Sequence, residues 1–410
     1  MRVADDVRHL LSKSIGVVQH RIDHRTVRAR LAARGPLPAP VEAVLYFADL
    51  PVNLYQLRQW YEPMRVLGER HPVAVVARSP ITAKVLLAEC PLPVEYVPSM
   101  EALEPWLARQ HVGAFFYVNQ NAANFSTMRM TEPAHVFVSH GESDKAYMAS
   151  NQLRAYDCTF VAGPAAVRRI EAAVYDLDPS RLLEIGRPQV DVDWPGPDLP
   201  DDGRTTVLYA PTWEGDRPSM SYSSLLTHGE ALVTSLTRTG RHRVVYRPHP
   251  RTGVQDSRYR AAHRRVVAVL EAANRADAAA RHVADTGRDF GWQVRAADVC
   301  VCDVSAVAFD WLASGKPIVL ARPESPTAVL GSTGLAARAP LLTAADAAGA
   351  AELVDHVLAT PDPAVAELTR DHFGDTSPGA SMERFLRAAS QVIEGRHRAQ
   401  AERHATGAGH

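Results

Sequence analysis

The sequence predicts an α/β protein with two doubly wound domains that face each other across a cleft. The chain has 410 residues, more than one hydrophobic core usually serves. Short apolar runs of strand length alternate with helical stretches, which is typical of parallel sheets covered on both faces. A segment rich in Pro, Gly and Asp at residues 191–204 interrupts this alternation and indicates a domain boundary.

The composition excludes several classes of protein. With 46% hydrophobic and 22% charged residues, the chain has the composition of a soluble globular protein. The formal net charge is -1, so we expect no nucleic acid partner. The four cysteines lack metal or disulfide spacing, and we expect reduced thiols. Because neither a signal peptide nor a run long enough to span a membrane is evident, we expect a cytoplasmic protein.

Residues 1–38 form a basic N-terminal segment. Apolar residues recur at three- and four-residue steps over residues 3–34, which predicts an amphipathic helix. Within residues 1–34, eight Lys or Arg stand against three Asp. Such a helix could rest peripherally on the anionic inner face of a membrane, or it could dock on its own chain. Both interpretations stay open.

The remaining chain divides into two strand-rich domains and a helical end. The first domain is expected at residues 39–195, the second at 196–360, and C-terminal helices with a polar tail at 361–410. The six runs that predict strands in the first domain are "VEAVLYFADL", "HPVAVVAR", "VEYVP", "VGAFFYVN", "AHVFVSHG" and "CTFVAG". The five in the second are "TTVLYAPT", "HRVVYRPHP", "HVADTG", "ADVCVCDVS" and "KPIVLAR". A helix is expected from Tyr259 to Arg281.

Ligands of open parallel sheets bind beyond the carboxyl ends of the strands, where four polar clusters fall. In the first, "VFVSHGESDK", His140 follows an apolar strand and Gly141 allows a ligand to approach the backbone. A neutral imidazole is suited to removing a proton from an alcohol. A single histidine at a strand end is also a common structural residue, so this alternative stays open.

The second cluster is "VLYAPTWEGD". The Thr212 hydroxyl, beside a turn fixed by Pro211, can donate to an oxyanion, and the Trp213 indole can cover a base or sugar. The alternative is a packed tryptophan with a capping threonine.

The third cluster, "VVYRPHP", combines two hydrogen-bond donors on a stiff backbone. Arg247 offers a planar fork of donors and His249 a further one, while Pro248 and Pro250 restrict the chain between and after them. This combination predicts a diphosphate site; the alternative is a structural ion pair at a strand end.

The fourth cluster is "ADVCVCDVSAVAFDWLASG". A buried strand is expected to end at Asp303, and Ser305 to cap a helix that stops at Gly315. The helix N-terminus and the Ser305 hydroxyl predict a phosphate site, with Asp310 a turn and a half into the helix. The alternative is a well-capped helix with nothing bound.

Motifs for dinucleotides, P-loop phosphates and zincin metals do not occur in the sequence. Because Arg247, His249 and the helix end can meet the charge of a diphosphate, no cofactor and no metal site are required. A divalent cation remains optional.

Together the clusters resemble the CDP-glycerol glycerophosphotransferase family, the teichoic acid primases and polymerases. The matching pieces are "HG" at 140–141, "YAPTW" at 209–213, "RPHP" at 247–250, and "DVSAVAFD" at 303–310 followed by "KPIVL". The resemblance implies a GT-B-like fold of two Rossmann-like domains, the first on the acceptor side and the second on the nucleotide-donor side. It also implies transfer of a polyol phosphate from a CDP-activated donor to a hydroxyl, with release of CMP. The acceptor would be a cell-wall or capsule glycan or polyol phosphate, which can be lipid-linked.

The resemblance also assigns roles to individual residues. It implies that His140 is the general base and that His249 takes part in catalysis. Donor-binding roles fall to Thr212, Arg247, His249, Asp303, Ser305 and Asp310, and acceptor-side roles to Gly141, Glu142 and Lys145. The chain departs from the family where it has "HGESDK" in place of the frequent "HGTPLK", and where Ala306 replaces a second serine.

Two other functions fit the same sequence. The first is a GT-B glycosyltransferase or a nucleotide-sugar epimerase, in which the sugar carbon is attacked in place of phosphorus. The released nucleotide distinguishes glycosyl transfer, which yields a nucleoside diphosphate, from polyol-phosphate transfer, which yields CMP. A non-catalytic nucleotide-binding protein could also retain the fold.

Overall fold

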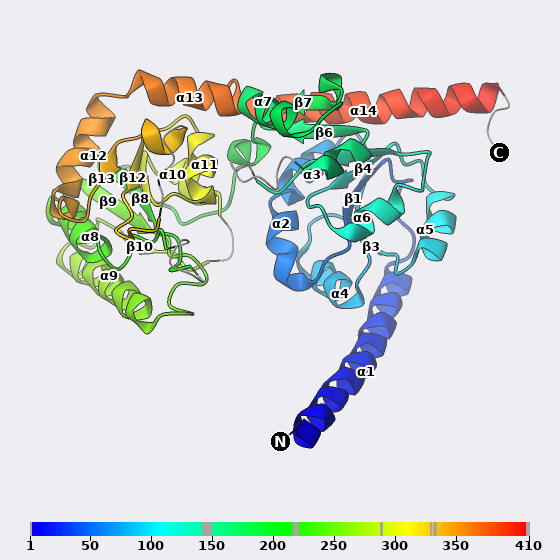
Figure 1. Cartoon of the computed structure of the whole chain (residues 1–410), viewed down its shortest axis with the longest axis horizontal. Helices are drawn as coiled ribbons and strands as arrows, with labels where there is room; N and C mark the ends of the chain where they lie inside the picture. Colours follow the sequence, from blue (N-terminus) through cyan, green and yellow to red (C-terminus); the bar gives the residue numbers. More distant parts are fainter. Residues whose placement is uncertain are drawn as a thin grey trace. The chain divides into compact units, whose positions relative to one another are not determined.

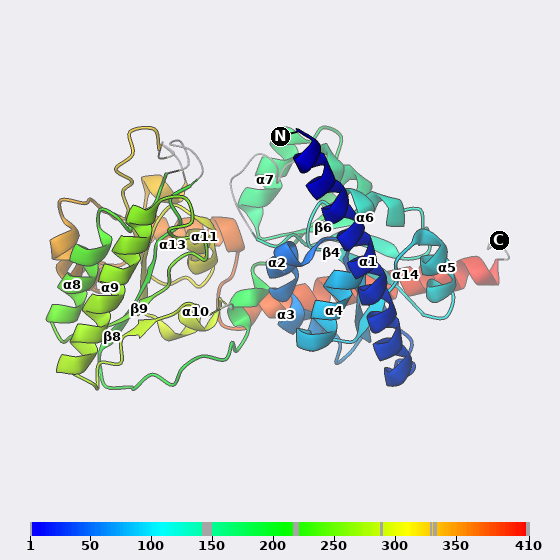
Figure 2. The same ribbon diagram turned by 90° about the horizontal axis from the view of Figure 1, so that it is seen from below.

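The computed structural model describes residues 2–141, 150–215, 221–287, 290–328, 330 and 334–406. The chain forms two compact units (Figures 1 and 2). Unit 1 comprises Met1–Val161, Ala166–Ile185 and Met382–His410, and unit 2 comprises Ala162–Ala165 and Gly186–Ser381. The last helix thus returns to the unit in which the chain begins.

Unit 1 is built on a parallel sheet that has seven strands in the described residues, in the order β3-β2-β1-β4-β5-β6-β7. The strands are β1 Ala43–Phe47, β2 Val73–Ala77, β3 Val94–Tyr96, β4 Ala114–Tyr117, β5 Ala134–Phe137, β6 Cys158–Val161 and β7 Leu182–Glu184. Every residue of β1 is buried, because alternate side chains enter the cores on the two faces of the sheet. Burial on both faces explains why these strands are continuous apolar runs.

Helices cover both faces of this sheet. The helices of unit 1 are α1 Arg2–Arg34, α2 Leu54–Arg58, α3 Tyr61–Leu67, α4 Pro80–Glu89, α5 Met100–Leu107, α6 Ala122–Thr127, α7 Pro164–Ala173 and α14 Ala380–Ala405. Helices α1 to α4 and α14 pack on one face, and α5 to α7 on the other. Phe385, Ala389 and Ile393 of α14 are fully buried in the first core, which fixes the C-terminal helix to unit 1.

Where its side chains are described, from residue 18 onward, helix α1 docks on unit 1 by one side. Val27 is fully buried in the core, and Asp23 accepts a hydrogen bond from Lys84 of α4 at 2.8 Å. On the other side, Arg21, Ile22 and Arg25 are exposed. Figure 2 shows the helix crossing α4. Among the helices of the described residues, none combines the length and the apolar character that a membrane span requires.

Unit 2 has a second parallel sheet, of six strands in the described part of the chain, in the order β10-β9-β8-β11-β12-β13. Its strands are β8 Thr205–Ala210, β9 His242–Tyr246, β10 Val283–Ala284, β11 Val299–Cys302, β12 Ile318–Ala321 and β13 Leu341–Leu342. Its helices are α8 Gly229–Arg238, α9 Ser257–Ala276, α10 Trp292–Ala296, α11 Ala306–Leu312, α12 Ala350–Ala359 and α13 Pro363–Phe373. Helices α8, α9 and α12 cover one face, and α10, α11 and α13 the other.

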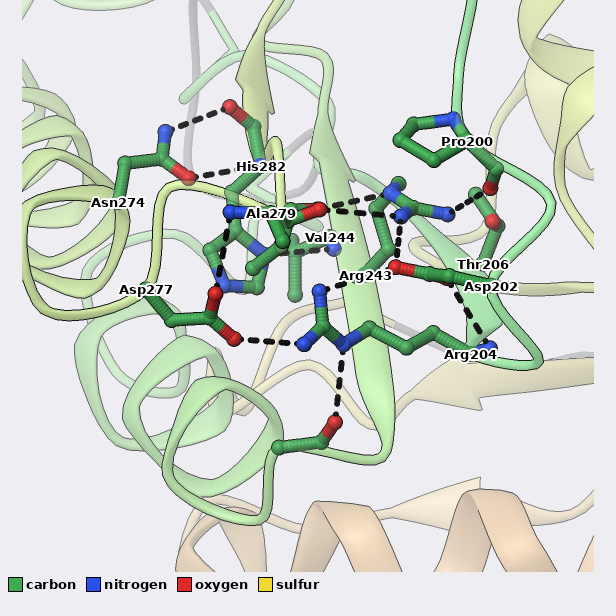
Figure 3. Close-up of polar contacts among 12 residues, drawn as sticks. Pro200, Asp202, Arg204, Thr206, Arg243, Val244, Asn274, Asp277, Ala279 and His282 are labelled. Atoms are coloured by element: carbon green, nitrogen blue, oxygen red, sulfur yellow. Dashed lines mark hydrogen bonds and ion pairs between the residues drawn. The ribbon is translucent and has the colours of Figure 1, made fainter.

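The amino end of β9 is held by buried charges (Figure 3). The Arg243 guanidinium, 1% exposed, donates to the Asp202 carboxylate at 2.9 Å and to the Ala280 carbonyl at 2.7 Å. The Val244 N–H donates to Nδ1 of His282 at 3.0 Å. Burial, helped by the charges of Arg204 and Arg243, lowers the pKa of His282 to about 4. This imidazole is therefore neutral at pH 7.

The predicted fold class is confirmed: the protein is α/β, with two parallel, doubly wound sheets. All eleven expected strands are present, and all four cysteines are free thiols. Two short strands, β7 and β13, were not predicted. Helix α9 ends at Ala276, five residues earlier than expected, since Asp277 adopts an extended backbone as the C-cap.

Candidate functional site

Each sheet has a topological switch point, where the strand order reverses. In unit 1 the switch lies between β1 and β4, and in unit 2 between β8 and β11. Crevices at the carboxyl ends of such strand pairs are the usual ligand sites of doubly wound sheets. The polar clusters singled out from the sequence follow β5, β8, β9 and β11.

A cavity of about 260 Å³ lies at the carboxyl ends of β1, β4 and β5 in unit 1, and we call it the switch-point cavity. It is lined by Asp49, Gln56, Asn119, Gln120, Asn121, Phe137, Ser139 and His140. Seven of these eight side chains are polar, so the cavity suits a ligand with many hydrogen-bonding groups.

His140 lies in this cavity with a defined tautomer. Its Nδ1 lies 3.1 Å from the Val118 carbonyl oxygen, which can only accept, so the proton is on Nδ1. Nε2 then carries the lone pair that a general base needs. The ring packs edge-on against Tyr55, at a centroid distance of 6.0 Å. A Cβ added to Gly141 would meet no atom of the described residues within 4 Å.

The turn that presents His140 is strained. Ser139 has a φ of 58°, in the left-handed region that non-glycine residues seldom adopt. Its carbonyl accepts a 2.6 Å hydrogen bond from the buried Trp60 indole, and its hydroxyl donates to the Gly141 carbonyl. Such backbone strain concentrates at functional sites, where the surrounding structure maintains it.

The same cavity is also lined by a network of two amides and a carboxylate. The Asn119 amide donates to Gln56 Oε1 at 2.8 Å and to Asp49 Oδ2 at a longer 3.4 Å. The Asn119 side-chain oxygen accepts from the Asn121 N–H, which fixes the orientation of the amide. Asp49 Oδ1 accepts from the Leu50 N–H. The Asp49 carboxylate therefore keeps acceptor capacity on Oδ2, which its 3.4 Å contact uses weakly.

In unit 2, Arg247 is oriented by a carboxylate on the neighbouring strand. Its Nη1 donates to Asp285 Oδ2 at 2.6 Å, and the two side chains are only 9% and 11% exposed. Asp285 in turn accepts from the Gly287 N–H at 2.9 Å and from the Gln293 amide. The guanidinium thus has a fixed direction beyond the end of β9.

His249 is neutral and presents an N–H donor. Burial, and then the charges of Arg251 and Arg247, lower its pKa. Its Nδ1 accepts a 3.1 Å hydrogen bond from the Arg251 N–H, so the proton resides on Nε2. Trp213 stacks near the ring at a centroid distance of 6.2 Å, and the Arg251 guanidinium lies 3.7 Å from the Trp213 centroid.

Asp303 connects the carboxyl ends of β8 and β11. Its carboxyl is fully buried and accepts from the Thr212 N–H at 2.7 Å and the Ser224 N–H at 3.1 Å. Burial raises its pKa to about 7, against the opposing effect of these hydrogen bonds. Asp303 therefore holds Thr212 in place from beneath the site.

Ser305 occupies the N-cap position of α11, but its hydroxyl makes no capping bond. The hydroxyl oxygen is buried and has no hydrogen-bond partner in the described structure. The sequence predicted a capping serine; Ser305 has the extended backbone of an N-cap residue, with φ of -155° and ψ of 175°, but its hydroxyl accepts no hydrogen bond from the helix. An unsatisfied buried hydroxyl is the kind of group that a bound ligand satisfies.

Asp310 of α11 pairs with an arginine that the sequence did not indicate. Arg187 Nη2 lies 2.8 Å from Asp310 Oδ1, and the guanidinium side chain is 9% exposed. Arg187 lies in the short segment that follows β7, at the start of unit 2. No motif marks this segment, so the pairing could be found only in three dimensions.

The structure brings two pairs of the predicted residues together, both in unit 2. Thr212 and Asp303 are bonded to each other, and Arg247 and His249 share one strand end. Glu142 and Lys145 lie outside the described residues. Asp49, Asn119 and Asp285 were missed, although each follows a strand, because their segments carry no motif. Within the described residues, no group of three or more His, Cys, Asp or Glu could hold a metal ion.

Known structures share this architecture. The wall teichoic acid polymerase TagF is 13% identical, with 88% of this chain and 90% of that chain covered and a TM-score of 0.54. A TagF structure obtained with CDPG has 14% identity, coverages of 88% and 89%, and the same TM-score. A putative UDP-N-acetylglucosamine 2-epimerase from Listeria monocytogenes is 12% identical, with coverages of 87% and 98% and a TM-score of 0.52. At these identities the similarity establishes the fold alone. No curated protein sequence matches the chain.

These features define a GT-B-like α/β protein with polar groups at the switch points of both sheets. Residues 115–327, more than half of the chain, match the family model of CDP-glycerol:poly(glycerophosphate) glycerophosphotransferases. The chain belongs to this family. The matched range includes His140, Arg247, His249 and Ser305. The family supports a transferase that uses a donor of the CDP-glycerol type.

Proposed function

We propose that the protein transfers a polyol phosphate, glycerol phosphate or a similar group, from a CDP-activated donor to a hydroxyl of a cell-wall or capsule acceptor. The acceptor is a glycan or a polyol phosphate, which can be lipid-linked, and CMP is released. The observation that carries this proposal is the Arg247 guanidinium, fixed by Asp285 beyond the end of β9 in a chain of this family. Its planar donors match the oxygens of a diphosphate.

On the donor side, three groups hold the diphosphate. Arg247 supplies the permanent positive charge, and His249 donates from Nε2 without a charge of its own. The Ser305 hydroxyl, which has no partner among the described residues, donates a third hydrogen bond. Fixed donors aimed at the phosphate oxygens stabilise the charge that develops on the departing CMP, and His249 takes its catalytic role in this way.

Two carboxylates position these groups. Asp303 accepts a hydrogen bond from the Thr212 backbone N–H and so fixes this turn. The fixed turn directs the Thr212 hydroxyl and the Trp213 indole at the donor. Asp310 is held by Arg187 and contacts the donor hydroxyls or organises that part of the site. Asp303 is fully buried, so it acts through Thr212.

On the acceptor side, His140 is the general base, and Gly141, Glu142 and Lys145 take the acceptor-side roles. The acceptor hydroxyl oxygen attacks the β-phosphorus of the donor, and its proton passes to Nε2 of His140. The new O–P bond forms as the bond from phosphorus to the bridging oxygen of CMP breaks. General base action contributes about 10²–10⁴-fold to the rate, and positioning and electrostatics supply most of the remainder.

The reaction requires no cofactor, because Arg247 and the hydrogen-bond donors meet the phosphate charge; a divalent cation is an optional addition. We also propose that the exposed side of α1, with Arg21, Arg25 and Arg28 beside Ile22, rests on the anionic inner face of the cell membrane. Lipid-linked acceptors would then be within reach of a cytoplasmic enzyme.

The test is a panel of CDP-polyols and UDP-sugars incubated with the protein and concentrated glycerol as the acceptor probe, with the released nucleotide identified by chromatography. We expect CMP from a CDP-polyol. Release of UDP from a UDP-sugar would favour glycosyl transfer and refute the proposal.

A variant separates catalysis from binding. We expect His140→Ala to lower CMP formation by about 10²–10⁴-fold and leave the donor Kd unchanged. Glu171→Gln, on the exposed face of α7, is the control and should retain full activity. Equal activity of His140→Ala and the wild type would eliminate His140 as the base.

A further inference from the structure

The switch-point cavity of unit 1 is lined by both a carboxylate and the proposed base. Asp49 follows β1, Asn119 follows β4 and His140 follows β5, so adjacent strand ends bring all three to one cavity of about 260 Å³. This volume lies just below the range of about 300–1,000 Å³ typical of drug-sized ligands. It suits a single sugar or polyol residue.

The polar groups of the cavity match hydroxyl groups. Asp49 Oδ2 is an acceptor with one weak contact, the 3.4 Å approach of the Asn119 amide. Gln56 is 9% exposed, and its orientation is fixed because its Oε1 accepts from Asn119 and its Nε2 donates to the Tyr55 hydroxyl. A hydroxyl group can donate to the carboxylate and accept from an amide N–H, so two neighbouring hydroxyls fit such a cluster.

The charge of Asp49 also selects against anions. A carboxylate repels a phosphate group in the same cavity, and a partly enclosed site screens this repulsion less than bulk water does. Phosphate oxygens are acceptors only, so they could not satisfy Asp49 by hydrogen bonding either. The cavity therefore favours an uncharged, hydroxyl-rich group over a phosphorylated one.

We infer that the switch-point cavity binds the uncharged, polyhydroxylated end of the acceptor, and that Asp49 determines its specificity against phosphate. The terminal sugar or polyol enters the cavity with its nucleophilic hydroxyl at His140 Nε2, and a phosphate attached directly to that residue weakens its binding. The assignment of this ligand as the acceptor rests on the proposed function. Binding of an uncharged polyol in the cavity does not.

The experiment measures binding in the cavity directly, on the full chain and without any donor. The NMR signal of the His140 imidazole, assigned as the one lost in His140→Asn, is titrated with glycerol, methyl β-glucoside or glycerol 3-phosphate. We expect both neutral probes to shift the signal in a saturable way. Glycerol 3-phosphate should shift the His140 signal only at a concentration at least about tenfold higher than glycerol needs. This holds even if glycerol 3-phosphate also binds the cationic site of unit 2.

The isosteric variant Asp49→Asn tests the specificity determinant. We expect its Kd for the neutral probes to rise about tenfold, since a charge-assisted hydrogen bond is lost, and the discrimination against glycerol 3-phosphate to disappear. Glu171→Gln is the matched control, a carboxyl-to-amide change on an exposed helix face, and should behave as wild type. A thermal unfolding curve of each variant confirms that it is folded.

The outcomes separate the two proposals. Glycerol 3-phosphate binding as tightly as glycerol at the His140 signal, unchanged neutral binding by Asp49→Asn, or no shift with either neutral probe would overturn the inference. If the His140 signal responds as expected but no CDP-polyol yields CMP, the proposed function fails while the cavity assignment stands. If CMP forms but the cavity binds no polyol, the cavity assignment fails while the proposed function stands.

Discussion

Replacing Arg247 should damage both donor binding and stability, and the structure shows how to separate the two effects. Arg247→Ala leaves the Asp285 carboxylate, 11% exposed, without its cation. Removing one partner of a buried ion pair costs about 3–5 kcal/mol. The Gly287 N–H and the Gln293 amide still donate to Asp285 in this variant. We therefore expect the loss in the free energy of unfolding to be at the lower end of this range, about 3 kcal/mol.

The double variant Arg247→Ala/Asp285→Asn removes the stranded charge. We expect it to recover most of the lost stability, because a neutral amide needs no counter-ion at this position. Donor affinity should not recover. Loss of one charged hydrogen bond costs about 1.5–3 kcal/mol, which is about a 10- to 150-fold rise in the donor Kd.

Thermal denaturation measures the stability, and calorimetric titration with CDP-glycerol measures the affinity. Arg258→Ala is the control, since its side chain is 73% exposed and its ion pair with Asp256 lies at the surface. If the double variant regains donor affinity together with stability, Arg247 is not a donor ligand. An unchanged melting temperature for Arg247→Ala would refute the buried ion pair.

Two further predictions concern His282 and α1. His282 has a pKa of about 4 in the folded chain, below the usual 6.5. Between these pH values the unfolded chain binds a proton at His282 that the folded chain does not. The free energy of unfolding therefore falls by about 3 kcal/mol as pH drops from 6.5 to 4. Urea unfolding of His282→Asn should show a smaller fall; an equal fall would exclude His282 as the cause. Replacing Arg21, Arg25 and Arg28 by Gln should weaken co-sedimentation with phosphatidylserine vesicles by about 1 kcal/mol per charge. Absence of wild-type sedimentation at low salt would refute the membrane contact.

Sequence reasoning yields site candidates where the pattern that marks a residue is local. Arg247 and His249 stand out because two prolines stiffen one strand end, and Asp303 and Ser305 because a buried strand runs directly into a helix. These patterns lie within a few residues of one another. Their presence at the carboxyl ends of β9 and β11 follows from strand direction alone.

Sequence reasoning failed where partners come from distant segments. Asp285 orients Arg247 across 38 positions, and Arg187 reaches Asp310 across 123. Asn119 approaches Asp49 across 70 positions. No short pattern records such pairings, because strand order decides which segments become neighbours.

The sequence by itself determined the two doubly wound sheets, because burial on both faces requires continuous apolar strands. It also supplied the candidate site residues, since their types and spacing predict phosphate chemistry. Only the tertiary structure decided the tautomers of His140 and His249, which depend on a carbonyl and an N–H brought to each ring by the fold. It alone placed Asp49 in the cavity that His140 lines, because β1 and β5 lie on either side of β4 in the sheet.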